Sequence, residues 1–216
     1  MNFLVDNYQR YDFETTPCLA TIFEFDLILD DDHSLNHEEM EILSKFGIFK
    51  ENCDVYKRFS ELLRERDFLR GNVVEVGAGV YSRLCEVIME DKPVELVNVT
   101  AYDPNLVFET IPGVNFVNKP FTKDTNIDDA DTLYGLFPCA ASITLIDKAI
   151  EENKNLLIAF CPCDHSDKEH IWWFGKYWAE DVCDDYIEKY GKKIEITKWN
   201  DEIGLDYPIM TYRRQK

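Results

Sequence analysis

A short apolar run that ends in an acid and two glycines is the stretch best suited to hold a ligand. Residues 71–79 read Gly-Asn-Val-Val-Glu-Val-Gly-Ala-Gly, and an amphipathic segment begins at Tyr81. This order predicts a buried strand, a tight turn and a helix. Glycine has no Cβ to hold a ligand away from the backbone, and a helix start offers free N–H groups. The stretch indicates a nucleotide-type cofactor site, although such glycines also occur in plain tight turns.

An aspartate at the end of the next predicted strand is the second candidate. Residues 96–102 predict a strand that ends at Asp103-Pro104. A carboxylate in this place can accept hydrogen bonds from both hydroxyls of a ribose. The alternative is a loop acid, because Asp-Pro-Asn is a common turn sequence. With the glycine turn upstream, we expect Asp103 to contact a ribose.

The elements that must position these residues alternate between strand and helix. Apolar periodicity predicts strands at 73–76, 96–102, 114–117, 132–137, 156–160, 193–199 and 208–212. One helix is predicted over 140–153 with Ile143, Ile146 and Ile150 on its buried face, and another from Ser166 to Tyr190. Such alternation predicts an α/β fold with a doubly wound, mostly parallel sheet, whose ligands bind at the carboxyl ends of the strands.

The sequence resembles a known family. The run Val-Val-Glu-Val-Gly-Ala-Gly (73–79), the downstream Asp103 and two strands after the last helix resemble the class I S-adenosylmethionine-dependent methyltransferase fold over residues 70–212. Residues 131–138, Asp-Thr-Leu-Tyr-Gly-Leu-Phe-Pro, are similar to a small uncharacterised methyltransferase-like family. The resemblance implies a seven-stranded Rossmann-like sheet with an antiparallel final strand, and S-adenosylmethionine as cofactor.

The resemblance also implies roles for individual residues. The methionine part of the cofactor would lie against the turn formed by Glu75, Gly77, Ala78 and Gly79. Asp103 would bind the ribose and Asn118 the adenine edge, while Leu136 and Phe137 would line the site near the methyl group. No general base stands out, so the catalytic residues are unknown.

Two readings of the cysteines stay open. Pro138-Cys139 and Cys161-Pro162-Cys163 are similar to the motifs of RNA cytosine-5 methyltransferases, in which a thiolate attacks the base. Alternatively Cys139, Cys161, Cys163 and His165 could bind zinc, although this spacing is not a standard one. Packed, unreactive thiols are the expected case, and we predict no metal.

Composition bounds the remaining possibilities. The 216 residues carry 42 acidic and 23 basic side chains, a formal net charge of -19 that makes nucleic acid an unlikely partner. No apolar run is long enough to cross a bilayer, and the start lacks the pattern of an export signal. With seven cysteines and no such signal, we expect a cytoplasmic protein with reduced thiols.

The expected organisation is an N-terminal helical extension over residues 1–70 and a Rossmann-like domain over 71–216, packed as one unit. We expect a methyltransferase that acts on a small molecule or a protein. The alternative is a non-catalytic nucleotide-binding or interaction protein that retains the fold. That alternative is suggested by Tyr81, which stands where the family's motif has a third glycine.

Overall fold

The computed structural model describes residues 55–79, 82–104, 106, 110–160, 175–198 and 208–215. Its elements are α4 (Val55–Glu65), β1 (Gly71–Val76), α5 (Arg83–Glu90), β2 (Leu96–Tyr102), β3 (Val114–Val117), β4 (Thr132–Leu136), η1 (Cys139–Ala141), α6 (Ser142–Glu151), β5 (Asn155–Ala159), α7 (Gly175–Tyr190), η3 (Gly191–Lys193), β6 (Ile194–Lys198) and β7 (Pro208–Tyr212). The helices predicted before residue 54 and the predicted helix start at Ser166 lie outside the described residues.

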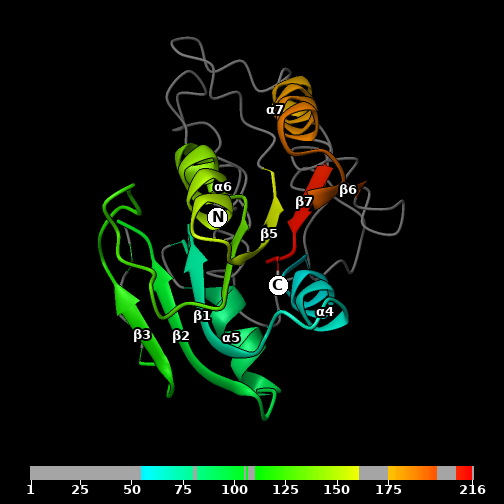
Figure 1. Ribbon diagram of the computed structural model, residues 1–216. Coiled ribbons are helices and arrows are strands. Elements are labelled where there is room, and N and C mark those ends of the chain that lie inside the picture. Colours follow the sequence, from blue (N-terminus) through cyan, green and yellow to red (C-terminus); the bar gives the residue numbers. More distant parts are fainter. Residues whose placement is uncertain are drawn as a thin grey trace, which may run out of the picture.

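The described strands form one seven-stranded sheet in the order β3-β2-β1-β4-β5-β7-β6 (Figure 1). The pairs from β3 to β5 are parallel, whereas β7 runs antiparallel to both β5 and β6. The first described strand, β1, lies in the middle of the sheet. The next two strands, β2 and β3, are added on one side of it, and β4 then pairs with β1 on the other side. This order confirms the predicted doubly wound, mostly parallel sheet with an antiparallel final strand.

Helices cover both faces of the sheet, and β5 shows why its sequence is apolar throughout. Leu157 and Ala159 belong to a buried cluster that contains side chains of α4 and α5. Leu156 and Ile158 belong to a second cluster, with side chains of α6 and α7. Because successive side chains of a strand point to opposite faces, a strand between two helical layers must be apolar at every position.

The helix before β1 is shorter than the sequence predicts. The sequence predicts a helical extension up to residue 70, but α4 ends at Glu65. Asp67 adopts a left-handed conformation with φ 62°, and the Phe68 amide donates to the Leu63 carbonyl at 2.9 Å. Both apolar side chains are buried in the same cluster. This is a Schellman cap, in which the left-handed residue ends the helix and the apolar pair closes over it.

The buried face predicted for α6 is partly wrong. Ile143 is 39% exposed, and the inner face is formed instead by Leu145, Ile146 and Ala149. At 100° per residue, Leu145, Ile146 and Ala149 lie on one stripe of the helix, and Ile143 lies outside that stripe.

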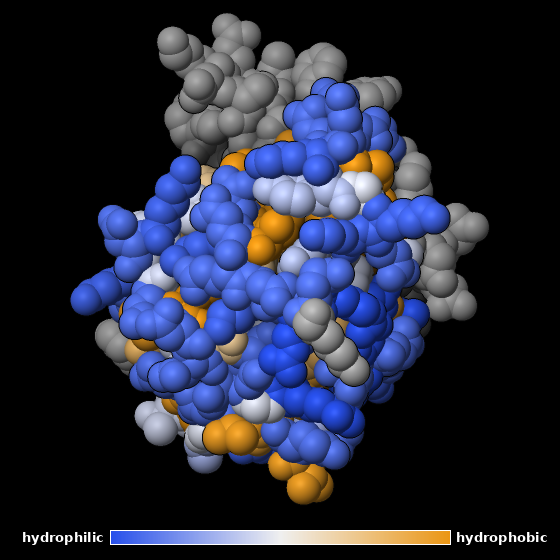
Figure 2. All heavy atoms as spheres, in the orientation of Figure 1, coloured by the Kyte–Doolittle hydropathy of each residue, from blue (hydrophilic) through white to orange (hydrophobic). Residues whose placement is uncertain are grey.

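The face of the molecule shown in Figure 2 is mainly polar. Figure 2 shows hydrophilic side chains over most of one face, with apolar atoms in small separate areas. Among the described helices, none is long and apolar enough to cross a membrane.

Candidate functional site

The turn after β1 is held in place by the neighbouring strand. The backbone amides of Gly77 and Ala78 both donate to the Tyr102 carbonyl, at 2.9 and 3.2 Å. Gly77 and Gly79 have φ values of 74° and 73°, which L side chains rarely adopt. The turn therefore needs glycine at both positions to pass from the strand toward α5.

Gly77 has a second reason to lack a side chain. A Cβ on this residue would lie 2.7 Å from Cα of Pro138, which follows β4. The sequence suggested that glycine here makes room for a ligand, but the structure shows that it makes room for the turn after β4. The two turns at the carboxyl ends of β1 and β4 are thus packed directly against each other.

Asp103 contacts the glycine turn. The Gly79 amide donates to Asp103 Oδ2 at 3.1 Å, and the Asp103 amide donates to the Val117 carbonyl at 3.3 Å. One residue therefore connects the turn after β1 with the ends of β2 and β3. A carboxylate has about four acceptor positions, so the bond from Gly79 leaves the predicted contact with a diol chemically feasible.

The other predicted site residues lie around the same edge of the sheet. Asn118 is exposed after β3, and its side-chain amide donates to the Leu106 carbonyl at 2.8 Å. Leu136 ends β4 and Phe137 follows it, and their side chains are 5% and 2% exposed. Phe137 has φ 55°, a left-handed conformation that turns the chain toward Pro138 and so toward the glycine turn. Their contacts with a cofactor remain predictions.

Glu75 lies behind the turn rather than on its surface. Its side chain is 2% exposed, and Cys85 Sγ of α5 donates to Glu75 Oε2 at 2.7 Å. Burial raises the pKa of Glu75 to about 7, because the charged form loses its hydration. The hydrogen bond from Cys85 opposes this shift, and the negative charge of Asp103 adds to it. The carboxyl group therefore titrates near neutral pH.

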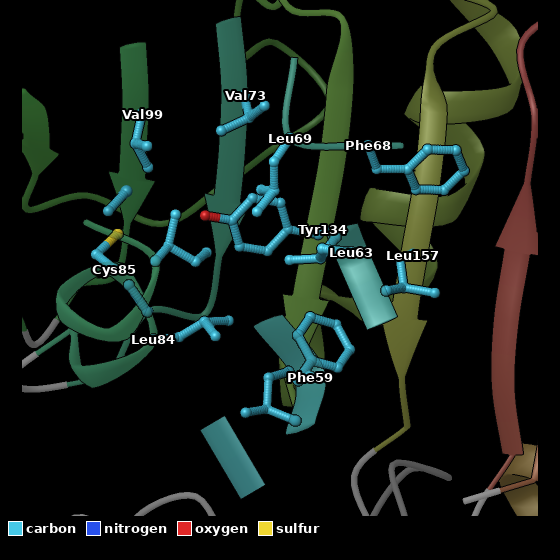
Figure 3. Packing of buried hydrophobic residues seen from close by; sticks show 14 of the residues in the cluster. Phe59, Leu63, Phe68, Leu69, Val73, Leu84, Cys85, Val99, Tyr134 and Leu157 are labelled. Atoms are coloured by element: carbon cyan, nitrogen blue, oxygen red, sulfur yellow. The ribbon is translucent and has the colours of Figure 1, made fainter. Parts of the chain in front are cut away.

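Three residues around Glu75 were not identified from the sequence. Cys85 and Tyr134 are fully buried, and burial raises the pKa of both the thiol and the phenol. Tyr134 Oη and the buried Ser82 Oγ make no hydrogen bond of good geometry within the described chain, but both lie close enough to the Cys85 thiol to oppose the rise in its pKa. Figure 3 shows the Tyr134 hydroxyl directed toward the side of the cluster on which Cys85 lies. We call these four residues, Glu75, Ser82, Cys85 and Tyr134, the Glu75 cluster.

A partial signal for this cluster was present in the sequence. Cys85 directly follows the apolar Leu84 in the amphipathic segment after the turn, so its burial could have been expected. Glu75 shares its side of β1 with Val73, which faces the same helical layer. Nothing in the sequence alone indicated that β4 would add Tyr134 opposite Glu75, a pairing fixed by strand register.

The described residues contain no group of three or more His, Cys, Asp and Glu side chains that could hold a metal ion. Cys161, Cys163 and His165 lie outside those residues, and the side chain of Cys139 is not described. The zinc site and the nucleophilic thiolate therefore remain hypotheses from the sequence.

Comparison with known proteins gives matches among solved structures alone. No protein-family model and no curated protein matches the sequence, so the narrower resemblance to the small methyltransferase-like family stays a prediction. Among solved structures, the 23S rRNA methyltransferase ErmE is 15% identical, with a TM-score of 0.48 over 77% of this chain and 70% of its own. The plantazolicin methyltransferase BpumL is 10% identical, with a TM-score of 0.49 over 83% of this chain and 92% of its own.

A third match is the Burkholderia thailandensis 1,6-didemethyltoxoflavin-N1-methyltransferase, which is 15% identical, with a TM-score of 0.43 over 94% of this chain and 93% of its own. These proteins are distant, and none of the three TM-scores reaches 0.5, so they do not show what this chain binds. They therefore give no support to the expected exclusion of nucleic acid as a partner. The strand order, the antiparallel β7 and the glycine turn joined to Asp103 give this chain the class I methyltransferase-like fold.

Proposed function

We propose that this protein is an S-adenosylmethionine-dependent methyltransferase. The observation that carries the proposal is the 3.1 Å hydrogen bond from the Gly79 amide to Asp103 Oδ2, at the carboxyl edge of a sheet with this strand order. It brings together Gly79 and Asp103, the two parts of the chain from which the sequence predicted a cofactor site. Ligands of open α/β sheets bind at this edge, where the strand order reverses on either side of β1.

The chemistry of the edge fits such a cofactor. Asp103 supplies a carboxylate where a ribose diol needs acceptors, and Gly79 supplies a stretch of backbone with no Cβ beside it. The packed turn after β4 brings Leu136 and Phe137 to the same edge, as an apolar wall. When bound, S-adenosylmethionine supplies an activated methyl group on a sulfonium. The protein's part is to orient an acceptor in line with that methyl group and to exclude water.

The methyl acceptor is proposed to be a small molecule or a protein. The net charge of -19 is unfavourable for a phosphate backbone, and this is our reason for placing RNA second. We keep the cytoplasm as the proposed compartment, which agrees with Cys85 and Cys183 being free thiols. A non-catalytic protein with the same fold is the alternative that a binding assay can separate.

Isothermal titration calorimetry with S-adenosylmethionine and S-adenosylhomocysteine tests the proposal, with NAD as a control ligand. We expect both methionine-derived ligands to bind and NAD not to bind. Absence of binding for both at millimolar ligand would refute the proposal. Binding without methyl transfer to any offered acceptor would favour the non-catalytic alternative.

A matched pair of variants tests whether Asp103 belongs to the cofactor site. Asp103→Asn keeps an oxygen that can accept from Gly79 but removes the negative charge and one acceptor for a diol. We expect it to weaken binding of S-adenosylhomocysteine by about 1–3 kcal/mol, or roughly 5- to 150-fold. Asp124→Asn makes the same chemical change at an exposed loop position and should leave the affinity unchanged. Equal affinities for the two variants would remove Asp103 from the site.

A further inference from the structure

The Glu75 cluster is a group of polar side chains that the proposed reaction does not use. Glu75, Ser82, Cys85 and Tyr134 are each at most 2% exposed. The one strong hydrogen bond among them is the 2.7 Å bond from Cys85 Sγ to Glu75 Oε2. Tyr134 Oη and Ser82 Oγ interact with the Cys85 thiol, a weak hydrogen-bonding group, and make no hydrogen bond of good geometry within the described residues.

The surroundings of the Glu75 carboxyl contain no described cation to balance a charge. The titratable groups that act on it are the Cys85 thiol of α5, the Tyr134 phenol of β4 and the Asp103 carboxylate after β2. Its register partner in β2 is Ala101, and α4 adds apolar side chains such as Phe59 to the same cluster. Every ionisable neighbour is neutral or negative, so both burial and charge favour a proton on Glu75.

Glu75 and the candidate cofactor site are electrostatically connected. The negative charge of Asp103, which receives the bond from Gly79, acts on the buried carboxyl of Glu75. A positive charge bound at the same edge has the opposite effect and stabilises the ionised carboxylate of Glu75. The low dielectric of the interior screens this attraction only weakly. A cation at Asp103 would therefore favour the ionised form of Glu75.

We propose that Glu75 is a buried proton-binding site that is coupled to the cofactor site, so that binding of a cationic ligand beside Asp103 releases a proton from Glu75. The inference rests on the proposed function, because the cation is the sulfonium of S-adenosylmethionine. S-adenosylhomocysteine has the same groups without the sulfonium charge, so its binding releases fewer protons from Glu75. By linkage, the preference of the site for the charged ligand rises with pH as Glu75 loses its proton.

Nuclear magnetic resonance of protein labelled with ¹³C at the glutamate carboxyl carbons tests the coupling directly. Glu75→Gln, which retains an oxygen to accept from Cys85, assigns the resonance by its loss. In the ligand-free wild type, we expect the Glu75 signal to titrate with a midpoint near pH 7. The midpoint should fall in Asp103→Asn, which removes one negative charge, and should fall in wild type saturated with S-adenosylmethionine. Asp124→Asn should leave it unchanged.

Calorimetry in two buffers of different ionisation enthalpy counts the protons that binding releases. At pH 7 we expect up to about half a proton per S-adenosylmethionine from Glu75, which is half protonated at its midpoint. The number of protons released on binding to Glu75→Gln is subtracted from the wild-type number, because it contains the protons that the ligand itself loses. A Glu75 signal that titrates below pH 5, or the same midpoint with and without the ligand, would overturn the inference while cofactor binding still stands. Failure of the ligand to bind would overturn the proposed function and the inference with it.

Discussion

Replacement of Glu75 by glutamine should change how the stability of this protein depends on pH. The folded protein keeps a proton on Glu75 up to pH about 7, whereas the unfolded chain loses that proton near 4.5. Between these values the folded state binds more protons than the unfolded state. The contribution of this group to stability is therefore complete at low pH and is lost as the pH rises through 7.

The size of the effect follows from the shift. A difference of about 2.5 pKa units corresponds to about 3 kcal/mol of unfolding free energy. Glutamine has nearly the same shape, accepts the Cys85 hydrogen bond and carries no titrating proton. The free energy of unfolding of Glu75→Gln minus that of the wild type should thus become more positive by about 3 kcal/mol from pH 4.5 to 8. The difference in unfolding free energy at a single pH is less informative, because the substitution can also change other contacts.

Urea unfolding followed by circular dichroism at about pH 5, 6, 7 and 8 provides the measurement. Glu90→Gln is the matched control, because Glu90 is exposed on the last turn of α5 and has no burial to disfavour its charge. Its difference from the wild type should vary by less than about 0.5 kcal/mol over the same range. If the Glu75→Gln difference is equally flat, Glu75 is ionised in the folded protein and the reasoning on the buried cluster is wrong.

Further predictions concern the glycine turn after β1 and the hydroxyl group of Tyr134. Gly77→Ala should destabilise the protein by more than about 2 kcal/mol, because it adds a clash with Pro138 to the strain of a positive φ. Gly191→Ala has the same kind of φ and open space around its Cβ, so chemical unfolding should show a loss of only about 1 kcal/mol; equal losses would contradict the packing of the two turns. Tyr134→Phe removes a buried hydroxyl whose interaction with the Cys85 thiol is weak and which makes no hydrogen bond of good geometry within the described residues, so its thermal unfolding temperature should stay the same or rise. A drop of several degrees would show that the hydroxyl is hydrogen-bonded.

The sequence was sufficient to predict the layout of the fold. Strands at 96–102 and 114–117 have the predicted bounds, and residues 208–212 form the predicted final strand. These predictions succeed because apolar periodicity reports which faces are buried, and it does so without reference to distant residues. The glycine turn and Asp103 were found in the same way, since their types and their places after strands are local properties.

The buried face of α6 and the end of α4 required more than periodicity. Ile143 fits an apolar pattern in the sequence, yet α6 packs against the sheet through Leu145, Ile146 and Ala149 and leaves the Ile143 side chain partly exposed. Asp67 ends α4 because Phe68 can fold back onto Leu63 in the core, and the sequence does not show that this contact is available. In both cases tertiary packing selected one of several locally acceptable conformations.

The sequence by itself thus determined the order of strands and helices and the two anchors of the candidate site. Only the tertiary structure decided what lies around Glu75. Strand register brings Tyr134 beside it, helix packing brings Cys85 against it, and the turn after β4 explains why residue 77 must be glycine. The pKa of a buried carboxyl depends on the hydration it has lost and on charges that the fold brings close, and both are properties of contacts between distant residues.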